Sequence, residues 1–242
     1  MGEMDHMQQC ALREAFGESS DDGNESISSS IKEAELYGWE TVPGIDGLWL
    51  CRNFLSETDE NLHLSTIHGE GLFTNGSHNQ AMRFGDLPGW ATNLTGLIRK
   101  AICFCALENK DQLAEEFGPL SFDLLWREPL FDQLIVNVYQ PGEGICAHID
   151  LMRFEDGIAI VSMESECVMH FSRADKGSED GFEVRVPILL NPGSLLVLSG
   201  EARYLWKHEI NRQTGFQMWN EKEIAQKRRT SITLRKLCAS KE

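Results

Sequence analysis

The sequence has no long apolar run and no leader-like start. No hydrophobic stretch in its 242 residues approaches the roughly 18 residues that a bilayer-spanning helix needs. The opening residues, MGEMDHMQQC, lack the basic and then apolar pattern of a secretory signal peptide. These absences exclude a membrane-spanning protein and favour an intracellular one, with the cytoplasm or the nucleus as the expected compartment.

The seven cysteines form no recognisable framework. Their number is odd and their spacing irregular, which excludes a disulfide-stapled miniprotein and favours reduced thiols. No cysteine–histidine pair has zinc-finger spacing, and Cys103 and Cys105 form C-x-C rather than C-x-x-C. A structural zinc site is therefore not expected, and the chain is long enough to bury a hydrophobic core of its own.

Basic residues are scarce: 22 lysines and arginines stand against 38 acidic residues, for a net charge of −16. Taken alone, this charge argues against nucleic acid, because a polyanion is held mainly by Lys and Arg at its phosphates. The charge is unevenly distributed, however. Residues 1–36 contain nine acidic and two basic residues, whereas residues 203–242 contain ten basic and four acidic ones. A basic patch around a pocket can therefore coexist with the acidic total.

The patterning predicts an acidic tail followed by one domain. The tail, residues 1–36, includes the polar stretch GESSDDGNESISSS, which has too few apolar residues to offset the entropy cost of ordering it. The domain, residues 37–242, divides into 37–130, where we expect support helices and a lid, and 131–242, where we expect a β-core.

The first part of the domain begins with a predicted strand, punctuated by turns, over residues 38–54. Helical signals follow it. Ser56 and Asp59 resemble a capping box that opens a short helix. Residues 66–90 show no sustained period, which predicts a long loop or a short ribbon. Apolar residues at helical spacing between 91 and 117 predict two helices.

Short β-rich runs dominate the second part. Eight of them follow one another from LIVNVYQ to TSITLRKL at intervals of roughly ten residues, separated by turn sequences such as PGEG and NPG. This texture predicts a mainly β fold, either a double-sheet β-sandwich or a jelly roll.

A histidine and an aspartate two residues apart follow the PGEG turn. His148 and Asp150 lie at the end of a predicted strand, where side chains at i and i+2 point to the same face. Together they would supply two thirds of the 2-His-1-carboxylate facial triad that holds non-haem Fe(II). Taken alone, an H-x-D pair is more often a chance occurrence or a simple His–Asp hydrogen bond than a metal site.

The third ligand would have to come from a distant strand. His208 is the strongest candidate, because it lies in YLWKHEI, immediately after the hydrophobic run SLLVLSG. His170, in VMHF, is the alternative. The other four histidines fall in the tail, a predicted helix or a loop, where a solvated surface position is expected.

Two arginines and two other polar residues alternate on predicted strands. Arg229 and Arg235 are six apart in RTSITLR and would share one face, as would Asn137 and Tyr139 before the turn. Directing them into a β-core is costly unless a ligand pairs with them, and a small dicarboxylate would meet the guanidinium groups. Alternatively, both arginines are exposed strand charges.

The joint pattern closely resembles the AlkB-like 2-oxoglutarate- and Fe(II)-dependent dioxygenases. N-x-Y is followed by H-x-D, a distant His and R-x5-R, and the resemblance covers roughly residues 44–238. The stretches YQPGEGICAHID, NPGSLLVLSGEARYLWKH and RRTSITLRKL are most similar to the branch that hydroxylates modified wobble uridines in tRNA.

The resemblance implies a double-stranded β-helix, or jelly roll, with N-terminal helices packed on one side. It implies that Fe(II) is held by His148, Asp150 and His208. It implies that 2-oxoglutarate is bound by Asn137, Tyr139, Arg229, Ser231 and Arg235. The distal carboxylate would pair with the first arginine, and the second would lie near the metal-chelating end. With O2 as co-substrate, the enzyme would hydroxylate a substrate carbon, and an N-methyl group hydroxylated in this way would leave as formaldehyde.

The resemblance also implies a nucleobase substrate, in RNA such as tRNA rather than in DNA. In the DNA-repair members an acidic residue two past the metal aspartate helps read the flipped base, and here that position is Met152. Residues 79–90 occupy the place of the substrate lid, where Arg83 and Phe84 could cover a phosphate and stack on a base. Alternatively, Phe84 and Trp90 pin this loop to the sheet.

Two other functions remain open at this stage. The same chemistry on a protein side chain would suit the acidic total charge. A non-catalytic binding module would suit a decayed site, but all three candidate ligands and both arginines are present. The expected partners are therefore a nucleic acid, RNA before DNA, or a protein substrate. An accessory subunit that delivers the substrate is a further expectation, and no membrane partner is expected.

Overall fold

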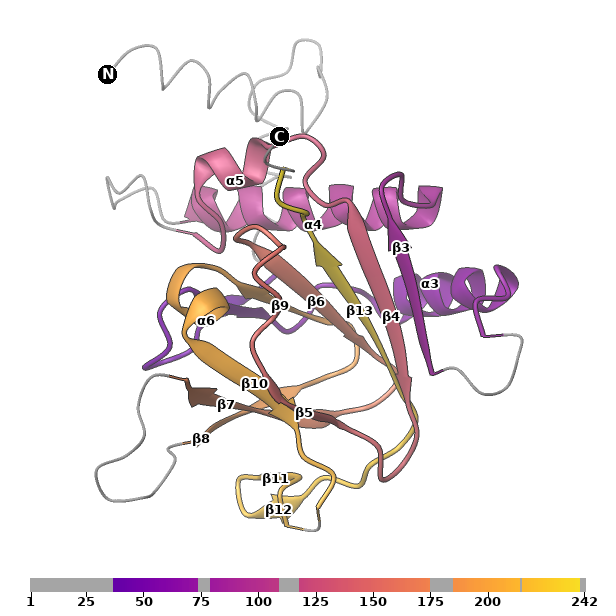
Figure 1. The fold of residues 1–242 in the computed structure, drawn as a ribbon. Helices are drawn as coiled ribbons and strands as arrows, with labels where there is room; N and C mark the ends of the chain where they lie inside the picture. Colours follow the sequence, from indigo (N-terminus) through magenta and orange to yellow (C-terminus); the bar gives the residue numbers. More distant parts are fainter. Residues whose placement is uncertain (1–36, 74–78, 109–117, 175–184, 214, 240–242) are drawn as a thin grey trace.

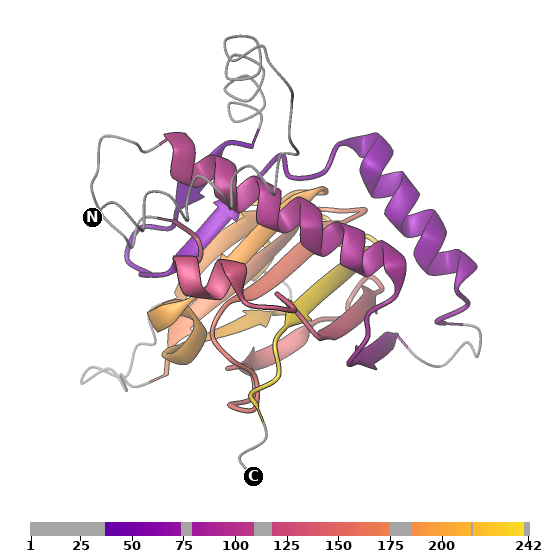
Figure 2. The ribbon, with the colours of Figure 1, turned by 90° about the horizontal axis from the view of Figure 1, so that it is seen from above.

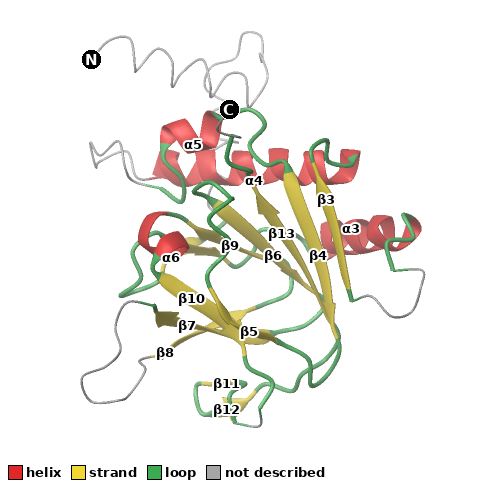
Figure 3. Ribbon diagram, viewed as in Figure 1, coloured by secondary structure: helices red, strands yellow, loops and turns green. Residues whose placement is uncertain are grey.

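The structure is a computed structural model that describes residues 37–73, 79–108, 118–174, 185–213 and 215–239. The predicted acidic tail lies outside the described residues. Three layers stack on one another: helices, a seven-stranded antiparallel sheet and a four-stranded antiparallel sheet (Figures 1 and 3). This arrangement confirms the predicted mainly β fold with helices packed on one side.

The seven-stranded sheet has the order β1-β2-β9-β6-β13-β4-β3. Its strands are β1 (Trp39–Thr41), β2 (Leu48–Cys51), β3 (Gln80–Phe84), β4 (Gln133–Tyr139), β6 (Ile158–Met163), β9 (Ser194–Leu198) and β13 (Arg229–Arg235). β1 and β2 lie in residues 38–54, where a strand was predicted, and β3 lies in residues 66–90, where a long loop or short ribbon was predicted. The region 37–130 therefore contributes strands to the large sheet as well as helices.

The four-stranded sheet has the order β5-β10-β7-β8. Its strands are β5 (Ile145–His148), β7 (Cys167–Arg173), β8 (Arg185–Leu190) and β10 (Trp206–Ile210). The short strands β11 (Met218–Trp219) and β12 (Lys222–Glu223) pair apart from it. Each of the eight predicted β-rich runs corresponds to one strand in the series β4–β10 and β13.

The helices are α3 (Glu57–Gly69), α4 (Gly89–Glu108), α5 (Phe122–Trp126) and α6 (Gly200–Tyr204). Ser56 caps α3 as predicted, because its Oγ accepts a hydrogen bond from the Asp59 N–H at 3.2 Å. α4 corresponds to the first of the two helices expected between residues 91 and 117, whereas residues 109–117 lie outside the described part of the chain. Seen from above, α4 crosses the large sheet (Figure 2).

Alternation along each strand divides the apolar residues between two cores. One face of β13, with Ile232 and Leu234, packs beneath α4 residues such as Leu94 and Ile98. The second core lies between the two sheets and includes Phe171. The face of β13 that carries Arg229, Ser231 and Arg235 is therefore turned toward the small sheet, away from the helices.

The segment before α4 is a strand edge rather than a free loop. β3 pairs with β4 in register from Gln80 opposite Asn137 to Phe84 opposite Gln133. Without β3, the outer edge of β4 would expose unpaired backbone groups, which explains why a stretch without clear periodicity still forms a strand. In the described part of the chain, no helix combines the length and apolar character needed to cross a bilayer.

Candidate active site

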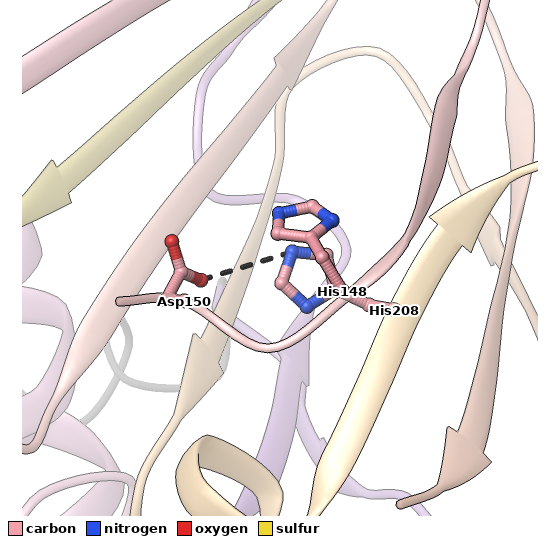
Figure 4. Close-up of side chains that lie close together, drawn as sticks. All are labelled: His148, Asp150 and His208. Atoms are coloured by element: carbon pink, nitrogen blue, oxygen red, sulfur yellow. Dashed lines mark ion pairs between the residues drawn. The ribbon is translucent and has the colours of Figure 1, made fainter. Parts of the chain in front are cut away.

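Two histidines face each other across the small sheet. β10 runs antiparallel to β5, and His208 lies directly opposite His148. β5 ends at His148, so Asp150 lies two residues beyond the strand rather than within it. Candidate ligand atoms of the three residues all lie within 4.8 Å of one another, and His208 Nε2 lies 3.8 Å from Asp150 Oδ2 (Figure 4).

The environment of these three side chains suits a divalent metal. His148 Nδ1 lies 2.8 Å from the Cys146 carbonyl oxygen, so Nδ1 donates its proton there and Nε2 keeps a free lone pair. Burial lowers the pKa of His208 to about 4, against the opposing influence of Asp150, which leaves this imidazole neutral. Asp150 Oδ2 and His208 Nδ1 are buried without a hydrogen-bond partner. A cation bound among these groups would pair with buried polar atoms that have no hydrogen-bond partner within the protein.

The alternative ligand, His170, lies on the wrong face. On β7, Phe171 is the residue opposite His208, whereas His170 is opposite Glu209. Since neighbouring residues on a strand alternate in direction, His170 points away from the metal-ligand group and stacks edge-on against Phe216. Its pKa is lowered mainly by burial.

Arg229 is a buried cation, and two of its three guanidinium nitrogens have no hydrogen-bond partner. Its side chain lies opposite Tyr139 on β4, with the guanidinium carbon 5.6 Å from the ring centroid. Nε donates to Ser162 Oγ at 2.9 Å, but both terminal nitrogens lack a hydrogen-bond partner. A small hollow adjoins it, lined in part by Tyr139, Cys167 and Ile210. Burial raises the pKa of Tyr139, so its hydroxyl stays protonated and able to donate to a carboxylate.

The remaining predicted 2-oxoglutarate residues share this inward face. Ser231 is buried opposite Asn137, whose Oδ1 accepts a hydrogen bond from Gln80 Nε2 at 2.7 Å. Arg235 reaches further and forms an ion pair with Asp150. The structure thus excludes the alternative that Arg229 and Arg235 are exposed strand charges, since their side chains are largely buried.

The structure places the predicted substrate-binding residues on different faces of the protein. Phe84 is 48% exposed and lies on the inward face, whereas Arg83 lies opposite Leu134, which belongs to the core under the helices. The Arg83 side chain is therefore turned away from Asp150, and its Nη1 donates to the Met82 carbonyl at 3.1 Å. Met152, two residues past Asp150, is 61% exposed. Trp90 is buried at the start of α4, so it anchors the helix rather than the strand.

Sequence reasoning missed Arg203, in α6. Its side chain is 1% exposed and donates hydrogen bonds to the backbone carbonyls of Asp150, Leu151 and Phe154 at 2.9, 2.8 and 3.0 Å. Because α6 leads directly into β10, one arginine ties the segment that carries Asp150 to the segment that carries His208. The only signal in the sequence is a charged residue between the apolar runs SLLVLSG and YLW.

The sequence of this chain is similar to a known family of proteins. Residues 47–235 match the profile of the 2OG-Fe(II) oxygenase superfamily. An Arabidopsis thaliana protein named "Alkylated DNA repair protein ALKBH8 homolog" is 29% identical over 243 residues, which cover 88% of this chain and 63% of that protein. A Macaca fascicularis protein named "tRNA (carboxymethyluridine(34)-5-O)-methyltransferase ALKBH8" is 48% identical over 80 residues, covering 33% of this chain and 11% of that protein.

A solved structure shares the fold. "The structure of OsALKBH1" superposes with a TM-score of 0.55 at 16% identity, covering 82% of this chain and all of that one. The chain belongs to the 2OG-Fe(II) oxygenase superfamily, and within it the chain is AlkB-like. It is accordingly an oxidoreductase of the dioxygenase class, with Fe(II) and 2-oxoglutarate as its cofactors.

Proposed function

We propose that the chain oxidises a modified nucleobase in tRNA, with Fe(II) held by His148, Asp150 and His208. The observation that carries this proposal is the combination of a buried His–Asp–His group with the unpaired terminal nitrogens of Arg229. A buried cation without an anion is costly, and a carboxylate of 2-oxoglutarate is the partner that would offset the cost. We infer that the catalytic domain spans residues 37–242 and that residues 1–36 form a tail outside it.

Each side chain has a distinct role in this proposal. Arg229 and the Tyr139 hydroxyl hold the distal carboxylate, with Asn137 and Ser231 completing the polar face beside them. Arg235 fixes Asp150 through their ion pair and carries positive charge toward the metal-chelating end. When bound, iron and 2-oxoglutarate supply the oxidising chemistry by which O2 is split between succinate and the substrate. The protein orients the groups and limits the access of water.

The nucleobase proposal rests on the relatives and on the rim of the site. Similar proteins carry names that refer to alkylated DNA repair and to carboxymethyluridine in tRNA. Met152 and Leu151 leave an apolar, exposed rim in the position where an acidic base-reading residue would stand. An apolar rim suits a stacked base and favours RNA over alkyl-DNA repair. A tRNA substrate would place the enzyme in the cytoplasm or the nucleus, with an accessory subunit supplying the binding surface that this acidic chain has little of.

Anaerobic spectroscopy tests the metal and cofactor assignment. Addition of Fe(II) and 2-oxoglutarate to the full chain should give a weak visible metal-to-ligand charge-transfer band. The band should vanish in folded His148→Ala and Asp150→Ala. Absence of the band in the wild-type chain, or its persistence in both variants, would count against the assignment.

Mass spectrometry tests the substrate. Nucleosides and proteins from cells lacking this chain should be compared with those from cells that express it. A tRNA nucleoside that accumulates without its hydroxylated or demethylated product supports the proposal. If every nucleoside is unchanged and a protein side chain loses a hydroxyl instead, the substrate is a protein.

A further inference from the structure

Arg153 lies on the rim of the site, with its guanidinium near two phenylalanine rings. Its guanidinium carbon lies 5.6 Å from the centroid of the Phe84 ring and 5.1 Å from that of the Phe154 ring. Arg153 is exposed, Phe84 is about half exposed, and Phe154 is buried. The two rings come from β3 and from the segment after Asp150, so the arginine bridges the edge of the large sheet and the candidate metal site.

The strand register shows that this bridge lies on the same face as Asp150. Phe84 is opposite Gln133, and Gln133 is opposite Arg235, so the three side chains form a row across β3, β4 and β13. Arg235 forms an ion pair with Asp150 and also lies over the inner ring, with its guanidinium carbon 4.9 Å from the Phe154 centroid. A continuous stack therefore runs from the candidate metal ligand outward to the exposed rim.

The positive charge of Arg153 is available to a ligand. Among the residues that the structure describes, no carboxylate forms an ion pair with its guanidinium. Guanidinium groups that stack on aromatic faces keep their N–H groups in the plane, where these can form two parallel hydrogen bonds to a phosphate. Because the rings already restrict the side chain, less conformational freedom is lost when an anion binds.

From this arrangement, and on the basis of the proposed RNA substrate, we propose that Arg153 binds a backbone phosphate next to the target nucleotide. Its aromatic neighbour Phe84 offers the exposed ring surface on which an adjoining base can stack. The sequence had indicated Arg83 for the phosphate contact, but that side chain is on the face turned toward the helices. Because the chain has a net charge of −16, a polyanion needs a local positive charge to bind it, and an arginine without an ion pair at the rim supplies one.

The test is RNA binding by the full chain loaded anaerobically with Fe(II) and 2-oxoglutarate. Fluorescence anisotropy would follow a labelled anticodon stem–loop RNA over a series of salt concentrations. Losing one phosphate contact on single-stranded RNA should reduce the slope of log K against log[salt] by about 0.7 and weaken binding about fivefold at about 0.1 M salt. We expect both changes in Arg153→Gln. Arg153→Lys should keep the slope but bind less tightly than wild type, because an ammonium group neither stacks as well nor bonds in parallel pairs.

Two comparison variants carry the same change of charge. Arg212→Gln removes an exposed arginine beside Gly144, at the opposite end of β5 from Asp150, and should leave the slope nearly unchanged. Arg83→Gln tests the rival cation. If Arg153→Gln matches Arg212→Gln, or if Arg83→Gln has the larger effect, the assignment of Arg153 is overturned while the proposed RNA substrate stands. If the wild-type chain shows the charge-transfer band but binds no RNA, the RNA substrate and the role of Arg153 fall together.

Discussion

His208 lies directly opposite His148 across the antiparallel pair of β10 and β5, with their ring centroids 4.4 Å apart. Two of the three candidate metal ligands are therefore positioned by the register of one strand pair. The third, Asp150, is held by an ion pair with Arg235 and by the hydrogen bonds of Arg203 to its backbone. Metal affinity should depend on each of these supports in a measurable way.

Histidine substitutions should separate ligands from bystanders. We expect His148→Ala and His208→Ala to weaken Mn(II) binding by more than about 100-fold, because a direct ligand should matter more than an outer-sphere partner. His170→Ala is the matched control, since it removes a histidine of the adjacent strand that points to the opposite face. Isothermal titration calorimetry with Mn(II) would measure all three. Equal losses in His170→Ala and His208→Ala would contradict the assignment.

Two glycine substitutions should act in opposite directions. At Gly144, just before β5, an added Cβ would overlap the carbonyl oxygen of Ile210 on β10. Gly144→Ala should therefore push the two strands apart, lower the free energy of unfolding by about 1–3 kcal/mol and weaken metal binding. At the exposed Gly96 in α4 a Cβ meets nothing within 4 Å, so Gly96→Ala should stabilise by about 0.5–1 kcal/mol. Urea unfolding of both variants gives the comparison, and a Gly144→Ala protein with normal stability would contradict the overlap.

Replacement of Arg229 should abolish the stabilisation of the fold by bound 2-oxoglutarate. In wild type with metal bound, 2-oxoglutarate at a hundred times its Kd should stabilise the fold by about 2.7 kcal/mol. Arg229→Met should lose this gain while the ligand-free protein keeps its stability, because the variant no longer buries an unpaired charge. Thermal unfolding with and without 2-oxoglutarate measures both. An undiminished gain in Arg229→Met would place the carboxylate elsewhere.

Arg203 should be needed for the shape of the metal site as well as for stability. Each hydrogen bond from a charged donor contributes about 1.5–3 kcal/mol, and three carbonyls would lose theirs in Arg203→Met. We expect a loss of several kcal/mol in urea unfolding and weaker Mn(II) binding. Arg203→Lys should recover part of both, since one ammonium group can reach fewer of the three carbonyls. If Mn(II) affinity is unchanged in a variant that still folds, Arg203 supports the fold alone.

Alternation and motif spacing predicted the strands and the candidate metal ligands. They did not predict which strands pair, or in which register. Period-two alternation in RTSITLR predicts that Arg229 and Arg235 share a face, but the burial of that face depends on how the small sheet is placed opposite it. His208 follows from its place after an apolar strand, whereas the rejection of His170 needed the register between β7 and β10. Registers depend on which strands meet, and that is a property of the whole sheet.

Arg203 and Arg153 were not predicted from the sequence, and the reason is the same for both. An arginine is by default a surface residue, so neither the buried Arg203 nor the stacked Arg153 differs from an ordinary solvated charge in the sequence. Arg83 was proposed because it lies in the segment that the family resemblance assigns to the substrate lid. Its side chain points the other way, because this segment forms the strand β3 in a stretch that lacks clear periodicity. Residues in short, irregular segments can be placed only after their pairing partner is known.

The position of β5 at the edge of the small sheet has a dynamic consequence. Among the strands that the structure describes, β5 is hydrogen-bonded to β10 alone. Its last residue, His148, is a candidate metal ligand and lies opposite a second one, His208, on β10. Coordination would join the two strands through their side chains as well as their backbones. Amide hydrogens of β5 should therefore exchange with solvent quickly in metal-free protein and slowly once metal is bound, so that loading of the site can be followed through the mobility of one short strand.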